Sequence, residues 1–349
     1  MRLAWITLVS FVLLSAPSWG QSEPDWFELT DLNKQDATRG FLFVDDKLLV
    51  SKVGDQDYGH RIEVFDGAGD VLLERVEFPH SVSQIYYRGP QSVLVTGKAY
   101  TDQWYTFYTE MTWGSGEFRL DSTRISPQVQ INEFGEVGGR FYFTEPGSRS
   151  VFLGRGHRMT ALPFEISFPS QIVDVGGSMW LLEKRGIGEG DERLVHIDLA
   201  TNEISRMPGV EGEYGPYNLR NFGSDWLVMD DRLGNRVAVY DTDKRDFRYS
   251  VELAETPMNI EIYGQCVVAP TGDAKKIHVI RLHDDHGELA STIDLTGIAG
   301  EFTNAIEVEV NGDNGIMFVK SVAPCFFCAE SQSAVYGIRT DLDWAATCH

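Results

Sequence analysis

A repeat with a period of about 43 residues constrains the fold of this chain more than any other feature. A segment typical of a β-strand ends in a polar turn and recurs seven times, as RIEVFD at 61–66, WYTFYT at 104–109, RSVFLG at 149–154, RLVHID at 193–198, RVAVYD at 236–241, KIHVIR at 276–281 and AVYGIR at 334–339. Successive copies end 43, 45, 44, 43, 40 and 58 positions apart, and the longest step holds an inserted loop. Four strands in a unit of this length are typical of a β-propeller blade.

A second strand type keeps the same interval and precedes each copy. It reads KLLVSKV at 47–53, SVLVTGK at 92–98, RFYFTEP at 140–146, MWLLEKR at 179–185, WLVMDDR at 226–232, CVVAPTG at 266–272 and IMFVKSV at 316–322. A short apolar segment comes before it, and a fourth segment such as VLLERVEF follows the third strand. The chain alternates apolar and polar residues with period two and has almost no helical periodicity. We therefore expect an all-β fold, a seven-bladed β-propeller with four-stranded antiparallel blades, formed by residues 21–349 as a single domain.

Residues 25–32, DWFELTDL, resemble a fourth strand that has no blade before it. A propeller ring has to close, because open blade edges expose unpaired backbone groups. We favour this N-terminal strand as the one that pairs with AVYGIR and closes the ring. Residues 341–347 are the alternative.

Residues 1–20 have the pattern of a secretory signal peptide. Arg2 precedes an apolar run over 3–16, and Pro17, Ser18 and Gly20 follow it. A membrane anchor is the alternative, but a spanning helix needs about 20 apolar residues and this run is shorter. We expect cleavage near Gly20, a periplasmic or secreted protein, and no transmembrane anchor.

The charge of the chain narrows the choice of partners. It has 30 Lys and Arg residues against 52 Asp and Glu residues, a formal net charge of -22. Nucleic-acid phosphates are repelled by so acidic a protein. We therefore do not expect a nucleic-acid partner.

Two segments resemble known propeller repeats. VHIDLATNEI at 195–204 is similar to the strand-turn-strand core of YVTN-type repeats, and RIEVFDGAGDVL at 61–72 is similar to the corresponding part of NHL repeats. The motif is clean in two or three units, while the second, third and sixth units depart from it. The resemblance implies a superfamily of propellers that includes the non-cofactor-bearing beta chain of quinoprotein amine dehydrogenases. Members of such a superfamily differ widely in function.

The segments that lead into the innermost strands should meet at one mouth of the central channel. In five of them a short polar residue stands just before the strand: Ser81, Gln171, Asn218, Asn259 and Asn304. Four charged or titratable residues lie nearby: His80, Arg220, Glu261 and Glu307. We expect the five polar residues to form a ring at the mouth, with the other four adding charge nearby, and all nine are candidates for ligand binding. For the amides we favour turn capping, in which each bonds to its own backbone, and contact with a ligand is the alternative.

Metal sites have weak support in the sequence. The loops between second and third strands are acidic at 54–59, 183–192, 230–235 and 270–276. Their carboxylates suit Ca²⁺, but the EF-hand spacing is missing and acidic turns are usually solvated, so we expect no metal or other cofactor, with Ca²⁺ as the alternative. His283 and His286 flank Asp284 and Asp285, which are metal-ligand types, but their peripheral hairpin predicts solvent exposure.

All four cysteines lie late in the chain: Cys266, Cys325, Cys328 and Cys348. An even number in an exported protein predicts disulfides, and four cysteines allow three pairings. Cys325 and Cys328 form a CFFC motif in the overlong loop. We favour a local bridge that staples this loop, while a redox dithiol and a link from the loop to Cys348 stay open. Phe326 and Phe327 are candidates for a partner contact.

Three functional hypotheses fit these features. The first is a binding or scaffolding module of the cell envelope, with a small ligand or an envelope protein as its partner. The second is a metal-assisted, lactonase-like hydrolase whose carboxylates meet at the channel mouth. The third is the propeller subunit of a periplasmic redox complex, which meets its partner through the CFFC loop. We favour the first, because the sequence shows no recognisable catalytic cluster such as GxSxG or HExxH.

Overall fold

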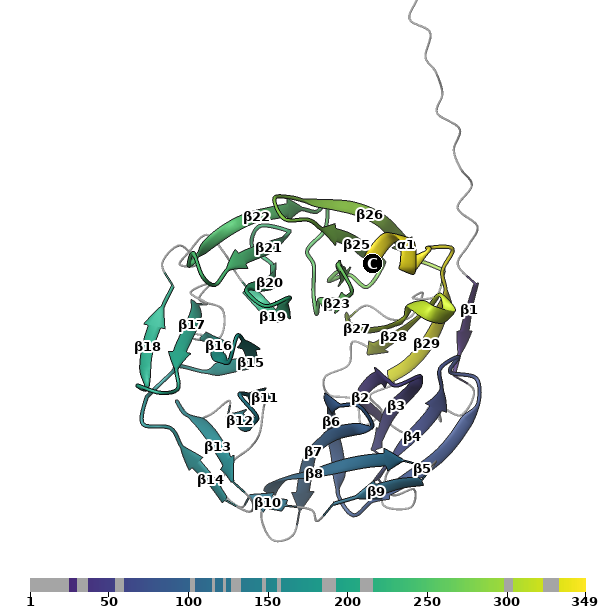
Figure 1. The fold of residues 1–349 in the computed structure, drawn as a ribbon. Coiled ribbons are helices and arrows are strands. Elements are labelled where there is room, and N and C mark those ends of the chain that lie inside the picture. Colours follow the sequence, from purple (N-terminus) through teal and green to yellow (C-terminus); the bar gives the residue numbers. More distant parts are fainter. Residues whose placement is uncertain are drawn as a thin grey trace, which may run out of the picture.

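The computed structural model describes residues 25–29, 37–53, 60–100, 104–114, 117–121, 124–126, 133–145, 149–155, 158–183, 193–207, 216–297, 304–322 and 333–349. These residues form seven antiparallel sheets arranged as blades around a central axis (Figure 1). The seven-bladed β-propeller predicted from the repeat is confirmed. The predicted signal peptide at 1–20 lies outside the described residues.

Blades are numbered along the chain, and their strands run outward from the axis. Blade 1 contains β2 (Ala37–Val44), β3 (Lys47–Val53), β4 (His60–Asp66) and β5 (Leu72–Phe78). Blade 2 contains β6 (Ser81–Gly89), β7 (Ser92–Tyr100), β8 (Trp104–Gly114), β9 (Glu117–Leu120) and β10 (Arg124–Ser126). Blade 3 contains β11 (Glu133–Val137), β12 (Arg140–Thr144), β13 (Val151–Arg155) and β14 (Arg158–Ala161). Blade 4 contains β15 (Pro169–Val175), β16 (Ser178–Glu183), β17 (Arg193–Asp198) and β18 (Glu203–Arg206).

The remaining blades follow the same pattern. Blade 5 contains β19 (Pro216–Phe222), β20 (Trp226–Asp231), β21 (Arg236–Asp241) and β22 (Asp246–Glu252). Blade 6 contains β23 (Glu261–Tyr263), β24 (Cys266–Pro270), β25 (Lys276–Leu282) and β26 (Gly287–Asp294). Blade 7 contains β27 (Asn304–Asn311), β28 (Ile316–Val322), β29 (Ser333–Arg339) and β1 (Asp25–Glu28), with the short 3-10 helix η1 (Gly312–Asn314) between β27 and β28.

The ring is closed by the N-terminal strand. β1 pairs antiparallel with β29, so that Trp26 lies opposite Ile338 and Phe27 opposite Gly337. This confirms the N-terminal segment as the closing strand. The alternative segment at 341–347 instead leads into a short helix, α1 (Trp344–Cys348).

Blade 2 differs from the expected four-stranded unit. Its third strand, β8, pairs with β10 through Phe107 and Ile125 and with β9 through Trp113 and Phe118. Two short strands therefore share the outer position of this blade. The sequence did not predict this division.

Apolar clusters between neighbouring blades form the core. Val64 of blade 1, for example, belongs to the same cluster as Val82 and Val95 of blade 2. Because a neighbouring blade covers each face, the middle strands bury residues on both sides, and β24 is buried at every position. This explains why the second strand of each unit is a nearly continuous apolar run.

The C-terminal helix α1 is attached to blade 6. A disulfide joins Cys266 of β24 to Cys348 of α1, and the indole of Trp344 is buried between blades 6 and 7. The link from the CFFC loop to Cys348, which the sequence left open as an alternative, is therefore wrong. Cys325 and Cys328 lie outside the described residues, and the local bridge between them stays a prediction. No helix in the described part of the chain is long and apolar enough to cross a membrane.

Candidate functional site

The innermost strands of all seven blades line one central cavity of about 1680 Å³. Eight of the predicted mouth residues line it: His80, Ser81, Gln171, Asn218, Arg220, Asn259, Glu261 and Glu307. The side chain of the ninth, Asn304, is not among those described, and Phe326 and Phe327 lie outside the described residues. The structure thus places these eight residues around one space, while their contact with a ligand stays a prediction.

A chain of side-chain amides crosses the mouth from blade 4 to blade 6. The Gln171 amide donates to Asn218 Oδ1, and Asn218 Nδ2 donates to Asn259 Oδ1 at 3.0 Å. Gln171 Oε1 also accepts the backbone N–H of Leu219. These hydrogen bonds join neighbouring blades, in contrast to the turn capping that the sequence favoured, in which each amide bonds to its own backbone.

Asp230, at the end of β20, holds this amide chain in place. Its buried carboxylate accepts the Asn218 backbone N–H at 2.6 Å, the Asn218 side-chain amide at 2.8 Å and the Asn259 backbone N–H at 3.1 Å. Gln171 and Asn259 have left-handed backbones, with φ of 43° and 52°. A non-glycine residue keeps such a conformation only where its surroundings fix it. This side of the mouth is therefore rigid.

Three charged or titratable residues occupy equivalent positions on the inner strands of neighbouring blades. They are Arg220 on blade 5, Glu261 on blade 6 and Glu309 on blade 7. Each lies two positions before the residue that closes its inner hairpin. Arg220 Nε lies 3.1 Å from Glu261 Oε2, and both side chains are about one-third exposed, at 33% and 31%. Burial lowers the pKa of Arg220, but the charge and hydrogen bond of Glu261 together with the charges of Glu133 and Asp230 outweigh it, and the net pKa is raised. This ion pair faces the cavity.

Glu309 is a site residue that the sequence reasoning missed. Burial raises its pKa well above the ordinary carboxyl value, and the charges of Glu261 and Glu307 add to the effect. Arg220 and a hydrogen bond from the Phe43 backbone oppose it only in part. Glu309 therefore holds a proton more tightly than an ordinary glutamate. The sequence spacing could have identified Glu309. Residues i and i+2 of a strand point to the same side, and Glu307, two positions earlier, was already a candidate.

Glu307 and its partner Lys320 connect blade 7 to blade 1. Lys320 Nζ lies 2.7 Å from Glu307 Oε2 and 6.0 Å from the centre of the Phe41 ring. The Lys320 side chain is buried, while Glu307 is exposed to the cavity. The lysine thus fixes the direction of the Glu307 carboxylate.

The opposite wall, on blades 1 and 2, is less charged. Burial raises the pKa of Tyr86 well above its ordinary value, and the charge of Glu133 adds to this, so the phenol is neutral. Burial lowers the pKa of His60, and the neighbouring His80 lowers it further. His80 packs on the ring of Phe107 with centroids 5.5 Å apart. Aromatic side chains therefore line the wall across from the charged residues of blades 5 to 7.

Carboxylates outnumber cations in the described lining of the cavity. The carboxylates are Asp45, Glu133, Glu136, Asp174, Glu261, Glu307 and Glu309, and the permanent cations are Lys98 and Arg220. Low-dielectric walls strengthen the field of such charges. The cavity is therefore a region of negative potential.

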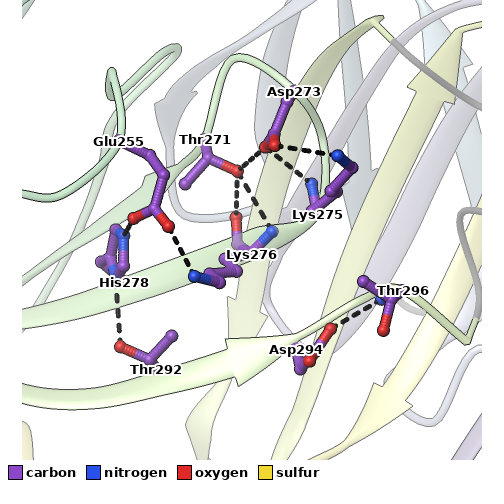
Figure 2. A network of polar contacts seen from close by, with 9 residues as sticks. All are labelled: Glu255, Thr271, Asp273, Lys275, Lys276, His278, Thr292, Asp294 and Thr296. Atoms are coloured by element: carbon purple, nitrogen blue, oxygen red, sulfur yellow. Dashed lines mark hydrogen bonds and ion pairs between the residues drawn. The ribbon is translucent and has the colours of Figure 1, made fainter.

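A polar network on blade 6 fixes the loop that leads to Asn259 and Glu261 (Figure 2). His278 joins Thr292 Oγ1 at 3.0 Å through Nδ1 and Glu255 Oε2 at 3.2 Å through Nε2, and Lys276 pairs with the same carboxylate. This places a hydroxyl, an imidazole and a carboxylate in the order of a catalytic triad. However, the His278 side chain is only 5% exposed and does not line the cavity. The network supports the site without forming part of it.

In the described acidic loops, the carboxylates of Asp231 and Asp273 bond to other groups of their own loop. Asp231 accepts the backbone N–H groups of Leu233 and Gly234 and pairs with Arg236 at 2.6 Å. Asp273 accepts hydrogen bonds from Thr271 and Lys275. Among the described His, Cys, Asp and Glu residues, one group brings its ligand atoms within 4.8 Å of one another, on the outer hairpin of blade 6 and away from the cavity. The loops at 54–59 and 184–192 lie outside the described residues, and Ca²⁺ binding stays untested.

Comparison with known proteins supports the fold. No protein-family model matches the chain, and a search of the curated proteins finds no match. Among solved structures, streptogramin B lyase matches with a TM-score of 0.61 and 14% identity over 90% of this chain and 97% of that chain. A chain of the mitotic checkpoint complex matches with a TM-score of 0.59 and 8% identity over 96% and 99% of the two chains. Hsv2 of Kluyveromyces lactis matches with a TM-score of 0.57 and 10% identity over 86% and 97%.

Identities this low show a shared fold and nothing more specific. The relation to YVTN and NHL repeats stays a prediction. The propeller fold itself is consistent with binding or scaffolding.

Proposed function

We propose that this protein is an exported binding module that takes a small organic cation into its central cavity. The observation that carries the proposal is the gathering of Glu261, Glu307 and Glu309 on one wall of the central cavity. A concave, mostly preformed pocket with a few converging polar groups is the usual form of a small-molecule site.

The charge balance of the cavity supports a cationic ligand. Burial raises the pKa of Glu309, the charges of Glu261 and Glu307 raise it further, and Arg220 opposes this only in part, so Glu309 binds its proton tightly. An ammonium group beside these carboxylates would supply the missing positive charge and displace that proton. The aromatic wall with Tyr86 and Phe41 supports the same choice, because ammonium groups are attracted to aromatic faces.

Export is supported by two independent features. The N-terminal apolar run has the pattern of a signal peptide. The disulfide between Cys266 and Cys348 suits an oxidising compartment such as the periplasm or the outside of the cell. We place the binding module in the cell envelope or in the medium.

Isothermal titration calorimetry with spermidine tests the proposal, with citrate as an anion of similar size. We expect binding of spermidine and none of citrate. Glu309→Gln should weaken spermidine binding by about ten-fold while it keeps the Arg220 to Glu261 pair intact. Glu252→Gln is the matched control, since it removes the same charge from an exposed position on β22. Equal loss in both variants would mean that only the net charge matters, and the proposal would be wrong.

Acid–base catalysis is a second candidate function, favoured by the difference between two neighbouring carboxyl groups. Glu309 has a raised pKa, while Glu261 lies 3.1 Å from Arg220 in an ion pair. Such unequal pairs serve as acid and base in many enzymes. A neighbour in fold, streptogramin B lyase, is a lyase by name. Proton NMR of the bound ligand distinguishes the two functions: turnover that Glu309→Gln abolishes would favour the enzyme.

The metal-assisted and redox hypotheses have less support. The described cavity carboxylates do not bring three ligand atoms within 4.8 Å of one another. The CFFC loop that would meet a redox partner lies outside the described residues.

A further inference from the structure

We propose that the hairpin between β25 and β26 binds a first-row transition metal ion, Zn²⁺, through His283, His286 and Glu288. One ligand atom from each side chain lies within 4.8 Å of the other two. The sequence indicated a solvent-exposed turn, and it gave no reason to include Glu288. The folded hairpin adds this carboxylate, because β26 begins directly after His286.

The distances suit a zinc site. His283 Nε2 and Glu288 Oε1 are 3.2 Å apart. Two ligands of a tetrahedral zinc ion, each about 2.0–2.2 Å from the metal, are themselves about 3.3 Å apart. The pair therefore already forms one edge of the required tetrahedron. The His286 ring is stacked on the His283 ring with centroids 4.6 Å apart, so that each ring has a nitrogen near the same point.

A neighbouring carboxylate orients the second histidine. His286 Nδ1 lies 2.8 Å from Asp285 Oδ1, which leaves Nε2 as the ligand atom. Metal-binding histidines commonly bond a carboxylate through their other nitrogen. Three protein ligands leave the fourth position of the ion for water, as in open zinc sites.

Blade 5 holds the turn from which the ligands project. The His283 N–H donates to His286 O at 2.9 Å, the Tyr249 hydroxyl donates to His283 O at 2.7 Å, and Arg248 donates to Asp284 O at 2.5 Å. Tyr249 and Arg248 belong to β22, which lies beside β26 at the outer rim (Figure 1). A turn fixed in this way loses little conformational entropy when the ion binds.

The ligand set selects the ion. Two imidazoles and one carboxylate suit Zn²⁺, Ni²⁺ and Cu²⁺, whereas Ca²⁺ and Mg²⁺ take oxygen ligands. The site lies on the outer hairpin of blade 6 and does not depend on the ligand proposed for the central cavity.

Calorimetric titration of the purified protein without an affinity tag tests the site, with ZnCl₂ and CaCl₂ as the two probes. We expect one Zn²⁺ bound per chain and no Ca²⁺ at this hairpin. His286→Ala and Glu288→Gln should each weaken Zn²⁺ binding by at least about ten-fold. Acidification should weaken it as well, because protons compete for the histidine ligands.

His80→Ala is the matched control, since this histidine lines the central cavity and should leave the zinc affinity unchanged. His286 is exposed, so its replacement should not unfold the protein, and a thermal melt without metal verifies this. Zn²⁺ should raise the melting temperature of the wild type and not that of His286→Ala. Absence of Zn²⁺ binding, equal affinity in His286→Ala, or loss of binding in His80→Ala would overturn the proposal.

Discussion

Cys266 and Cys348 are joined by a disulfide with their Cα atoms 5.2 Å apart, although 82 positions separate them in the chain. The bond holds α1 on blade 6, where Trp344 packs in one cluster with Ile338 of blade 7. β1 is bound to the edge of blade 7. Both described ends of the chain are therefore fixed where the ring closes (Figure 1).

Removal of this disulfide should destabilise the propeller. The double variant Cys266→Ala/Cys348→Ala should lose about 2–5 kcal/mol of unfolding free energy, because the unfolded chain regains the freedom of a long closed loop. Urea denaturation without reductant measures the change. A non-reduced digest should contain the Cys266 peptide linked to the Cys348 peptide, and a link from Cys348 to Cys325 or Cys328 would contradict the structure.

Gly337 should be intolerant of a side chain. A Cβ at this position would lie 2.2 Å from Cζ of Phe27, which crosses β29 from the closing strand. Gly337→Ala should therefore displace β1 and cost about 1–3 kcal/mol. Gly114→Ala is the control, since the Cβ would meet only Gln91 Oε1 at 3.9 Å. Thermal denaturation compares the two, and equal melting temperatures would contradict this role of β1.

Glu309 should make stability depend on pH. A carboxyl with a raised pKa in the folded state stabilises the fold below the ordinary carboxyl pKa, and this contribution is lost as the pH rises through the folded pKa. Glu309→Gln removes the group. The variant should be more stable than the wild type by about 1 kcal/mol near pH 8 and should lose this advantage near pH 4. A stability difference that does not change with pH would contradict the charged environment of Glu309.

Glu255 should show the opposite dependence. A hydrogen bond from Lys276 lowers its pKa, burial opposes this, and a hydrogen bond from His278 lowers it further. Its contribution is present above the ordinary carboxyl pKa and is lost as the pH falls through the lowered pKa. Glu255→Gln should cost about 1 kcal/mol near neutral pH and little in acid. Chemical denaturation at both pH values measures this, with Glu252→Gln as an exposed control that should change neither.

The strands could be predicted because buried blade strands have a simple signature. The ranges predicted at 47–53, 193–198, 236–241 and 316–322 agree with β3, β17, β21 and β28 at both ends. Each is an apolar run bounded by residues typical of turns. The division between β9 and β10 was missed, since it depends on how the chain after β8 turns back on itself.

The cavity could be predicted only in part. Gln171, Asn218 and Asn259 were found because they occupy the same place in successive repeats. The hydrogen bonds between them were not, since they join residues more than 40 positions apart. Glu309 was missed although Glu307, two positions earlier on β27, was a candidate, because its raised pKa comes from burial in the folded ring and from Glu261 on another blade.

A crystal structure of the protein soaked with spermidine would show whether the central cavity binds an organic cation. We expect an amine nitrogen inside the cavity, within about 2.7–3.2 Å of a carboxylate oxygen of Glu261 or Glu309. An empty cavity at saturating spermidine, or spermidine bound only on the outer surface, would contradict it.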